Sequence, residues 1–70
     1  MHRILLAHPD CLDRFCDFLR AVQVEVHESS AAGVLASVPG ALSDQHERRE
    51  LSGYVTTWNA LNPAAHVELA

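Results

Sequence analysis

Three histidines stand at the ends of strands that the sequence predicts. His8 follows an apolar run, His27 follows an alternating run, and His66 opens the last alternating run. Imidazole nitrogens, combined with a carboxylate or a thiolate, are ligands that suit zinc, nickel or copper. Further ligand types lie in the neighbouring turns: Asp10, Cys11 and Glu28. The sequence therefore offers a metal-binding or metal-delivery site at one end of a sheet, provided that the fold gathers these residues.

In a second interpretation, these histidines bind no metal ion. The chain contains no CxxC or HExxH spacing or a comparable metal-binding motif. In the predicted sheet His27 lies two strands away from His8, about 10 Å by the spacing of strands. Histidines at strand ends are then solvated polar groups that bind nothing. Both hypotheses are compatible with the residue types.

Cys11 raises a third kind of chemistry, nucleophilic catalysis. In the predicted first helix it lies in the first turn, where the helix dipole favours a thiolate, and His8 is close enough in sequence to act as a base. No third group or oxyanion site accompanies them, and cysteines in helices usually pack. Cys16, five residues along the same helix, is badly placed for a disulfide. We expect two reduced cysteines and no enzymatic activity.

Four predicted strands must position these residues. Residues 3 to 8 form a short apolar run stopped by Pro9, which predicts a buried strand. Residues 22 to 27 alternate valine with polar side chains, which is typical of an edge strand. A polar connection at 28 to 33 leads to a mostly apolar strand at 34 to 38. The last strand, at 66 to 69, alternates again.

Two amphipathic helices separate these strands. Apolar residues recur at three- and four-residue spacing from Leu12 to Val22, just after Pro9 and Asp10. Ser43 or Asp44 can cap the second helix, which ends at Asn62-Pro63. Four carboxylates on these helices are predicted to face solvent: Asp13, Asp17, Glu47 and Glu50. Glu47, three residues after Asp44, is also placed as in a capping box.

Gly53 interrupts the second helix. Glycine inside a helix is less favourable than alanine by about 1 kcal/mol. Close packing of the helix against the sheet or the other helix would explain a glycine there. We therefore expect Gly53 at a helix contact.

The order strand, helix, strand, strand, helix, strand predicts an α+β fold. It is the order of the ferredoxin-like split βαβ, in which two helices cover one face of a four-stranded antiparallel sheet. The usual strand order, 4-1-3-2, places the first and third strands centrally, and these are the two most continuously apolar strands here. One domain spanning residues 1–70 accounts for all six elements. The architecture resembles that of small-molecule-sensing regulatory domains, which often dimerise.

Charge and hydropathy restrict the partners. The formal charge is −4 with five Lys+Arg, all arginine, which disfavours nucleic acid as a partner. The apolar run from Ile4 to Ala7 is too short for a signal peptide or a membrane span. We expect a cytoplasmic protein without a membrane partner.

The face of the sheet opposite the helices is predicted to be uncovered. If Ile4 and Leu6 point inward, the outer face carries either one or the other side of the third strand. The first alternative gives an interface of Leu5, Ala7, Leu35 and Ser37, and the second replaces the last two with Val34, Ala36 and Val38. An apolar centre with a polar rim is typical of an interface.

We therefore predict a small non-enzymatic interaction or regulatory domain that self-associates as a homodimer or binds another protein. Contact through the open face is one arrangement, and edge pairing of the second or fourth strand is another. Apart from the transition metal considered above, no cofactor is expected. The competing interpretation is a monomer with a modest apolar patch.

Overall fold

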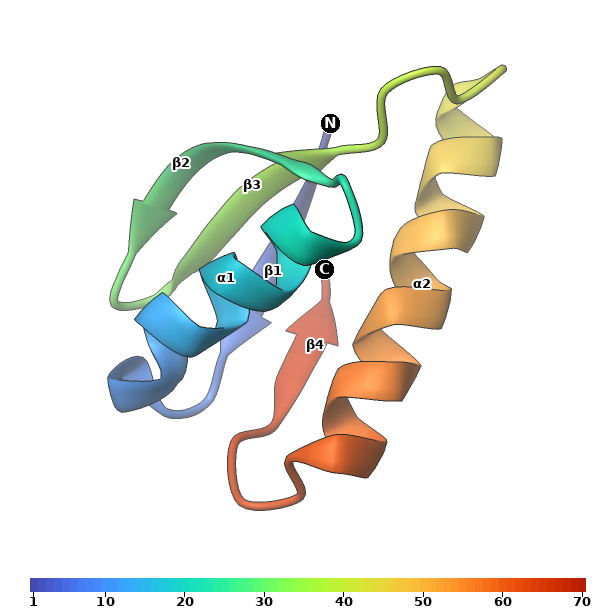
Figure 1. Ribbon diagram of the computed structural model, residues 1–70. Helices are drawn as coiled ribbons and strands as arrows, with labels where there is room; N and C mark the ends of the chain where they lie inside the picture. The colour runs from blue at the N-terminus through green and yellow to red at the C-terminus, as the bar shows by residue number, and fades with distance from the viewer.

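The computed structural model of residues 1–70 has one antiparallel sheet with two helices on one of its faces (Figure 1). The strand order is β2-β3-β1-β4, which confirms the predicted α+β ferredoxin-like fold and its central first and third strands. The elements are, in chain order, β1 (His2–Leu6), a 3-10 turn η1 (Pro9–Cys11), α1 (Leu12–Ala21), β2 (Glu25–Ser30), β3 (Gly33–Ser37), α2 (Asp44–Leu61) and β4 (Val67–Leu69).

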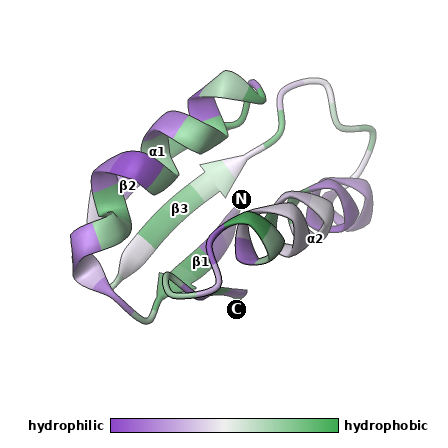
Figure 2. Cartoon of the chain, turned by 60° about the horizontal axis from the view of Figure 1, so that its bottom comes forward, coloured by the Kyte–Doolittle hydropathy of each residue, from purple (hydrophilic) through white to green (hydrophobic).

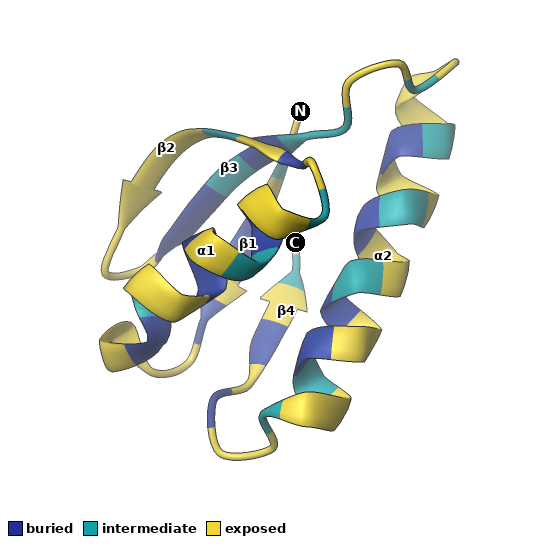
Figure 3. Ribbon diagram, viewed as in Figure 1, coloured by how far each residue is buried: buried dark blue, intermediate teal, exposed yellow.

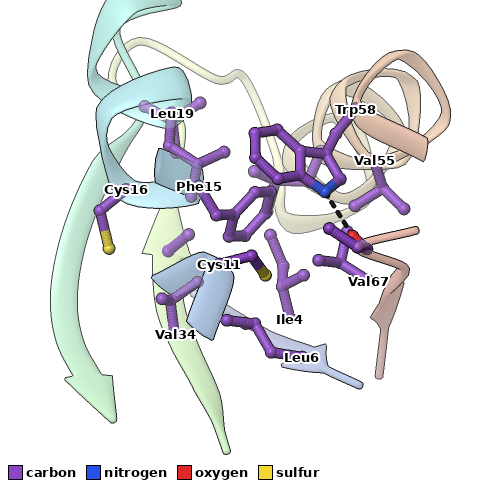
Figure 4. Packing of buried hydrophobic residues seen from close by; sticks show 14 residues of the cluster. Ile4, Leu6, Cys11, Phe15, Cys16, Leu19, Val34, Val55, Trp58 and Val67 are labelled. Atoms are coloured by element: carbon purple, nitrogen blue, oxygen red, sulfur yellow. Dashed lines mark hydrogen bonds between the residues drawn. The ribbon is translucent and has the colours of Figure 1, made fainter. Parts of the chain in front are cut away.

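The hydrophobic core lies between the helices and the inner face of the sheet, and Trp58 joins its parts (Figure 4). Its indole packs edge-on against Phe15 of α1, with 5.0 Å between ring centroids. The indole N–H donates to the Ala65 carbonyl at 2.7 Å, which fixes the loop between α2 and β4. Buried strand residues complete the core: Ile4, Leu6, Val34, Ala36 and Val67.

The second strand lies later in the chain than predicted. β2 runs from Glu25 to Ser30, and Gln23, with φ 64°, makes the turn that follows α1. The hairpin needs only Ala31 and Ala32, because Ser30 already pairs with Gly33. The expected connection at 28 to 33 is therefore wrong. Its polar residues belong to an edge strand that is exposed along most of its length (Figure 3).

The second helix begins where predicted and has one of the two expected caps, but it lacks the expected capping box. Ser43 is the N-cap, and its hydroxyl accepts the His46 N–H at 3.0 Å. Glu47 does not close a capping box, and it is not on a solvated face. Its carboxylate accepts the Val38 N–H at 2.7 Å, and the residue is only 8% exposed.

Two further expectations concern Gly53 and the carboxylates on the outer faces of the helices. Gly53 is exposed, and a Cβ built there meets no atom within 4 Å, so the expected close packing is wrong. Asp13 and Asp17 are exposed, as predicted, and Glu50 is partly exposed. Neither helix is both long and apolar enough to cross a bilayer.

Candidate functional site

The outer face of the sheet has an apolar centre made by two leucines. Burial of Ile4 turns Leu5, on the central strand β1, to the uncovered side, where it is 42% exposed. Leu35 of β3 lies on the same face and is partly exposed. It pairs with Arg3, whereas Leu5 pairs with Gly33, so the two leucines lie in neighbouring rows across the sheet. Figure 2 colours much of both central strands as hydrophobic.

The structure shows which side of β3 faces outward. Leu35 and Ser37 are on the open face, whereas Val34 and Ala36 are fully buried in the core. Ala7, the fourth predicted interface residue, is exposed just beyond the end of β1. The expected interface residues are thus all accessible.

Charges of both signs surround the two leucines. Arg3 and Glu28 lie on either side of Leu35 in one row across the sheet, and Glu68 lies beside Leu5 in the next row. Arg3 and Glu28 form no ion pair within the chain, and Glu68 lies near His66 alone, at 3.4 Å. The face therefore presents unpaired charges next to apolar side chains.

Ser37 at the rim of this face hydrogen-bonds His27 of β2. The serine oxygen lies 2.6 Å from His27 Nε2. A serine nucleophile needs its acid partner on the other ring nitrogen, to orient the imidazole. Glu25 instead approaches the same Nε2, at 3.7 Å, and the group is exposed to solvent. The arrangement is a polar rim contact and lacks the geometry of a catalytic triad.

The three histidines predicted as metal ligands do not come together. His66 lies beside the end of β1, since its carbonyl accepts the Ala7 N–H at 3.1 Å, and His8 follows directly. His27 is inside β2 at the opposite end of the sheet, next to residues that pair near the start of β1. Its displacement follows from the later position of β2 in the chain described above. The shared metal site is therefore not formed by His8, His27 and His66.

The thiols are buried. Cys11 is 2% exposed and Cys16 is 5% exposed, and both are free (Figure 4). Burial raises the pKa of the Cys16 thiol, which disfavours the thiolate. Both cysteines pack in the core, in agreement with their predicted role.

A shallow hollow of about 460 Å³ lies around the start of β2. Arg20 from α1 and Glu25 from β2 line it, so its walls carry both signs of charge. The remaining lining residues are Gln23, Val24, Val26, His27 and Pro39. The hollow offers no charge preference and no convergent set of reactive groups.

A second polar cluster joins the start of β1 to the first turn of α2. His2 Nε2 lies 3.1 Å from Asp44 Oδ1 and 3.9 Å from Glu47 Oε2. The Met1 ammonium donates to Glu47 Oε2 at 2.9 Å. The side chains of His2 and Glu47 are only 12% and 10% exposed, whereas that of Asp44 is 76% exposed.

The environment of Glu47 favours its ionised form. Hydrogen bonds from the Met1 ammonium and the Val38 amide lower the pKa of Glu47, and burial opposes them. The same ammonium–carboxylate contact raises the pKa of the Met1 amine. Sequence reasoning missed this cluster because Met1 and His2 are more than forty residues from Asp44 and Glu47. The one available signal was His2, a potential ligand directly before the predicted first strand.

Comparison with protein families, with curated proteins and with solved structures found no match. The geometry alone must therefore support a function.

Proposed function

We propose that this protein is a small non-enzymatic interaction domain that forms a homodimer through the outer face of its sheet. The observation that carries the proposal is Leu5, a large apolar residue 42% exposed at the centre of that face. Leu35 extends the apolar centre, and no other element of the chain covers it. Burying both leucines against a second copy removes apolar surface from water.

The charges on the face support a second copy as the partner. A twofold axis places the same face on both subunits, so each residue meets a different residue of its copy. Arg3 and Glu28, both without an ion pair in the chain, flank Leu35 on opposite sides. A twofold axis near the two leucines can bring Arg3 of one subunit against Glu28 or Glu68 of the other. The face is thus complementary to itself in charge as well as in hydrophobicity.

The free edges of the sheet are less suited to pairing. On β4, the Asn59 side chain from α2 binds both backbone groups of Val67, each at 2.9 Å, so this edge is capped. On β2, the ladder is interrupted between Val26 and Glu28, and glutamates stand at positions 25 and 28. Bulges and charges of this kind discourage strand addition. We therefore favour the face over either edge.

The proposed setting is the reducing cytoplasm. Both cysteines are free and buried, which is compatible with a reducing compartment. The net charge of −4 makes another protein a better candidate partner than nucleic acid. A regulatory role for such a dimer remains part of the same proposal.

Leu5→Glu tests the proposal directly. A glutamate at the centre of the interface would have to lose its hydration or separate the subunits, so the dimer dissociation constant should rise at least about tenfold. Sedimentation equilibrium measures it, and circular dichroism checks the monomer fold. Leu61→Glu is the matched control, because Leu61 is 69% exposed at the end of α2, away from the sheet face. Equal effects of the two changes would contradict the proposal.

A charge exchange tests the predicted contact. Arg3→Glu should weaken association, because the new carboxylate meets the acidic groups of the partner. Adding Glu28→Arg to this variant should restore association. If the double variant is as weak as Arg3→Glu alone, then Arg3 does not meet Glu28 across the interface.

A further inference from the structure

His2, Asp44 and Glu47 bring three metal-ligand groups to one point. One donor atom from each lies within 4.8 Å of the other two, and no other set of three histidine, cysteine or acidic residues in the chain does so. Two of the three side chains are nearly buried, which limits their rotamer freedom. Glu47 is also held in place by the Val38 N–H on its other oxygen.

The spacing of the donors is close to that of a metal site. Zinc ligands at about 2.0–2.1 Å from the ion in a tetrahedron are about 3.3 Å from one another. His2 Nε2 is 3.1 Å from the Asp44 oxygen and 3.9 Å from the Glu47 oxygen. These two distances lie on either side of the ligand–ligand separation in a tetrahedral zinc site.

We propose that His2, Asp44 and Glu47 bind a divalent transition metal ion of the zinc type. One imidazole and two carboxylates are a donor set that Zn²⁺ accepts, with solvent in the fourth position. The site lies at the inner side of the sheet, at the junction of β1 and α2, whereas the proposed dimer uses the outer face. The metal site is therefore independent of the proposed dimer.

The Met1 ammonium occupies the position of a cation at this cluster. It lies 2.9 Å from the Glu47 oxygen and 3.9 Å from the Asp44 oxygen. A metal ion takes the place of this ammonium, which must move aside. Binding also requires an unprotonated Nε2, which puts the imidazole proton on Nδ1. The Arg48 guanidinium then loses its 3.5 Å contact with Nδ1 and keeps its 2.6 Å hydrogen bond to the Ala70 carbonyl.

Other histidine–carboxylate pairs in the chain provide controls. His46 lies 3.3 Å from Glu50, and His66 lies 3.4 Å from Glu68. Each pair has a distance similar to that between His2 and Asp44, but neither has a third ligand group within reach. If paired residues alone bound zinc, these two sites would respond as strongly as His2.

Titration with Zn²⁺ followed by NMR of the five imidazoles tests the proposal. We expect saturable binding of one equivalent that shifts the His2 signals and leaves those of the other four histidines in place: His8, His27, His46 and His66. Binding centred on any of those four histidines, or the absence of saturable binding, would overturn the proposal. Because His2 and Glu47 also support the fold, the variant of choice is Asp44→Asn, at the most exposed ligand.

Calorimetry of the variants completes the test. Asp44→Asn should weaken Zn²⁺ at least about tenfold, since even changes outside the ligand shell commonly have that effect. The control Glu50→Gln, in the His46–Glu50 pair, should leave the affinity unchanged. Acetylation of the Met1 amine removes the competing cation and should strengthen binding. Weaker binding after acetylation would make the amine a ligand and contradict displacement of the ammonium.

Discussion

The structure does not require a glycine at position 53. It lies in the middle of α2, exposed, with open space where a Cβ would be. Gly53→Ala should therefore stabilise the protein by about 1 kcal/mol, the difference in helix propensity between the two residues. Urea denaturation followed by the fluorescence of Trp58 measures the change. No gain in stability would mean that α2 needs its glycine for a contact beyond this chain.

At Gly33, in contrast to Gly53, the structure leaves no room for a Cβ atom. A Cβ at Gly33 would overlap the carbonyl oxygen of Ile4 in the neighbouring strand, and the backbone cannot yield easily there. Gly33→Ala should destabilise the protein by about 1–3 kcal/mol, as overpacking does. The same denaturation experiment gives the value. A neutral result would show that β1 and β3 separate more readily than their pairing suggests.

Single residues were predictable from sequence when their role depended on near neighbours. Leu5 was placed on the outer face by the alternation of β1, and Ser43 was one of two caps proposed for α2. Glu47 was misplaced, because a glutamate in the first turn of a helix normally serves the helix itself. Its true partners, Met1 and Val38, come from other elements. Local sequence contains no information on such a contact.

At the scale of elements, Asn59 attaches β4 to α2. Its side chain donates to the Val67 carbonyl and accepts the Val67 N–H, both at 2.9 Å. Asn59→Ala should destabilise the protein by about 1–3 kcal/mol, because two backbone groups of a three-residue strand lose their partner. Hydrogen exchange should accelerate at the Val67 amide before it does in β3. Unchanged protection of Val67 would contradict this role.

Glu47 links β1, the end of β3 and α2, and its contribution should depend on pH. Its folded-state pKa is below the ordinary 4.5, so the stabilisation is present above that pH and is lost as pH falls through the folded-state pKa. Glu47→Gln should thus be less stable than wild type at pH 7, and the difference should shrink in acid. Urea denaturation at several pH values measures it. A difference independent of pH would exclude a contribution from the charge.

The elements themselves were mostly predictable, and the exception has a physical cause. Helices were found by their three- and four-residue periodicity, which both amphipathic stretches show clearly. The boundaries of β2 were wrong because an edge strand that faces water on most sides does not need apolar residues. Glu28 and Ser29 therefore resembled a loop, although both pair with β3.

At the scale of the whole molecule, the predicted strand order came from the usual ferredoxin-like topology, and the structure has this order. The hydropathy patterns agreed with it, because central strands are covered by neighbours on both edges and are therefore rich in apolar residues. The gathering of His8, His27 and His66 did not follow, because it depended on where β2 ends. What lies against the outer face is a property of the assembly. The two leucines and the unpaired charges around them support a second copy.

The mass of the wild-type protein in solution tests the central claim most directly. Sedimentation equilibrium over a range of concentrations should give twice the chain mass of 7.7 kDa, with dissociation on dilution. Added salt should weaken the dimer if ion pairs of Arg3 contribute. A mass of 7.7 kDa at every concentration would contradict the proposed self-association and leave the protein a monomer with an exposed apolar patch.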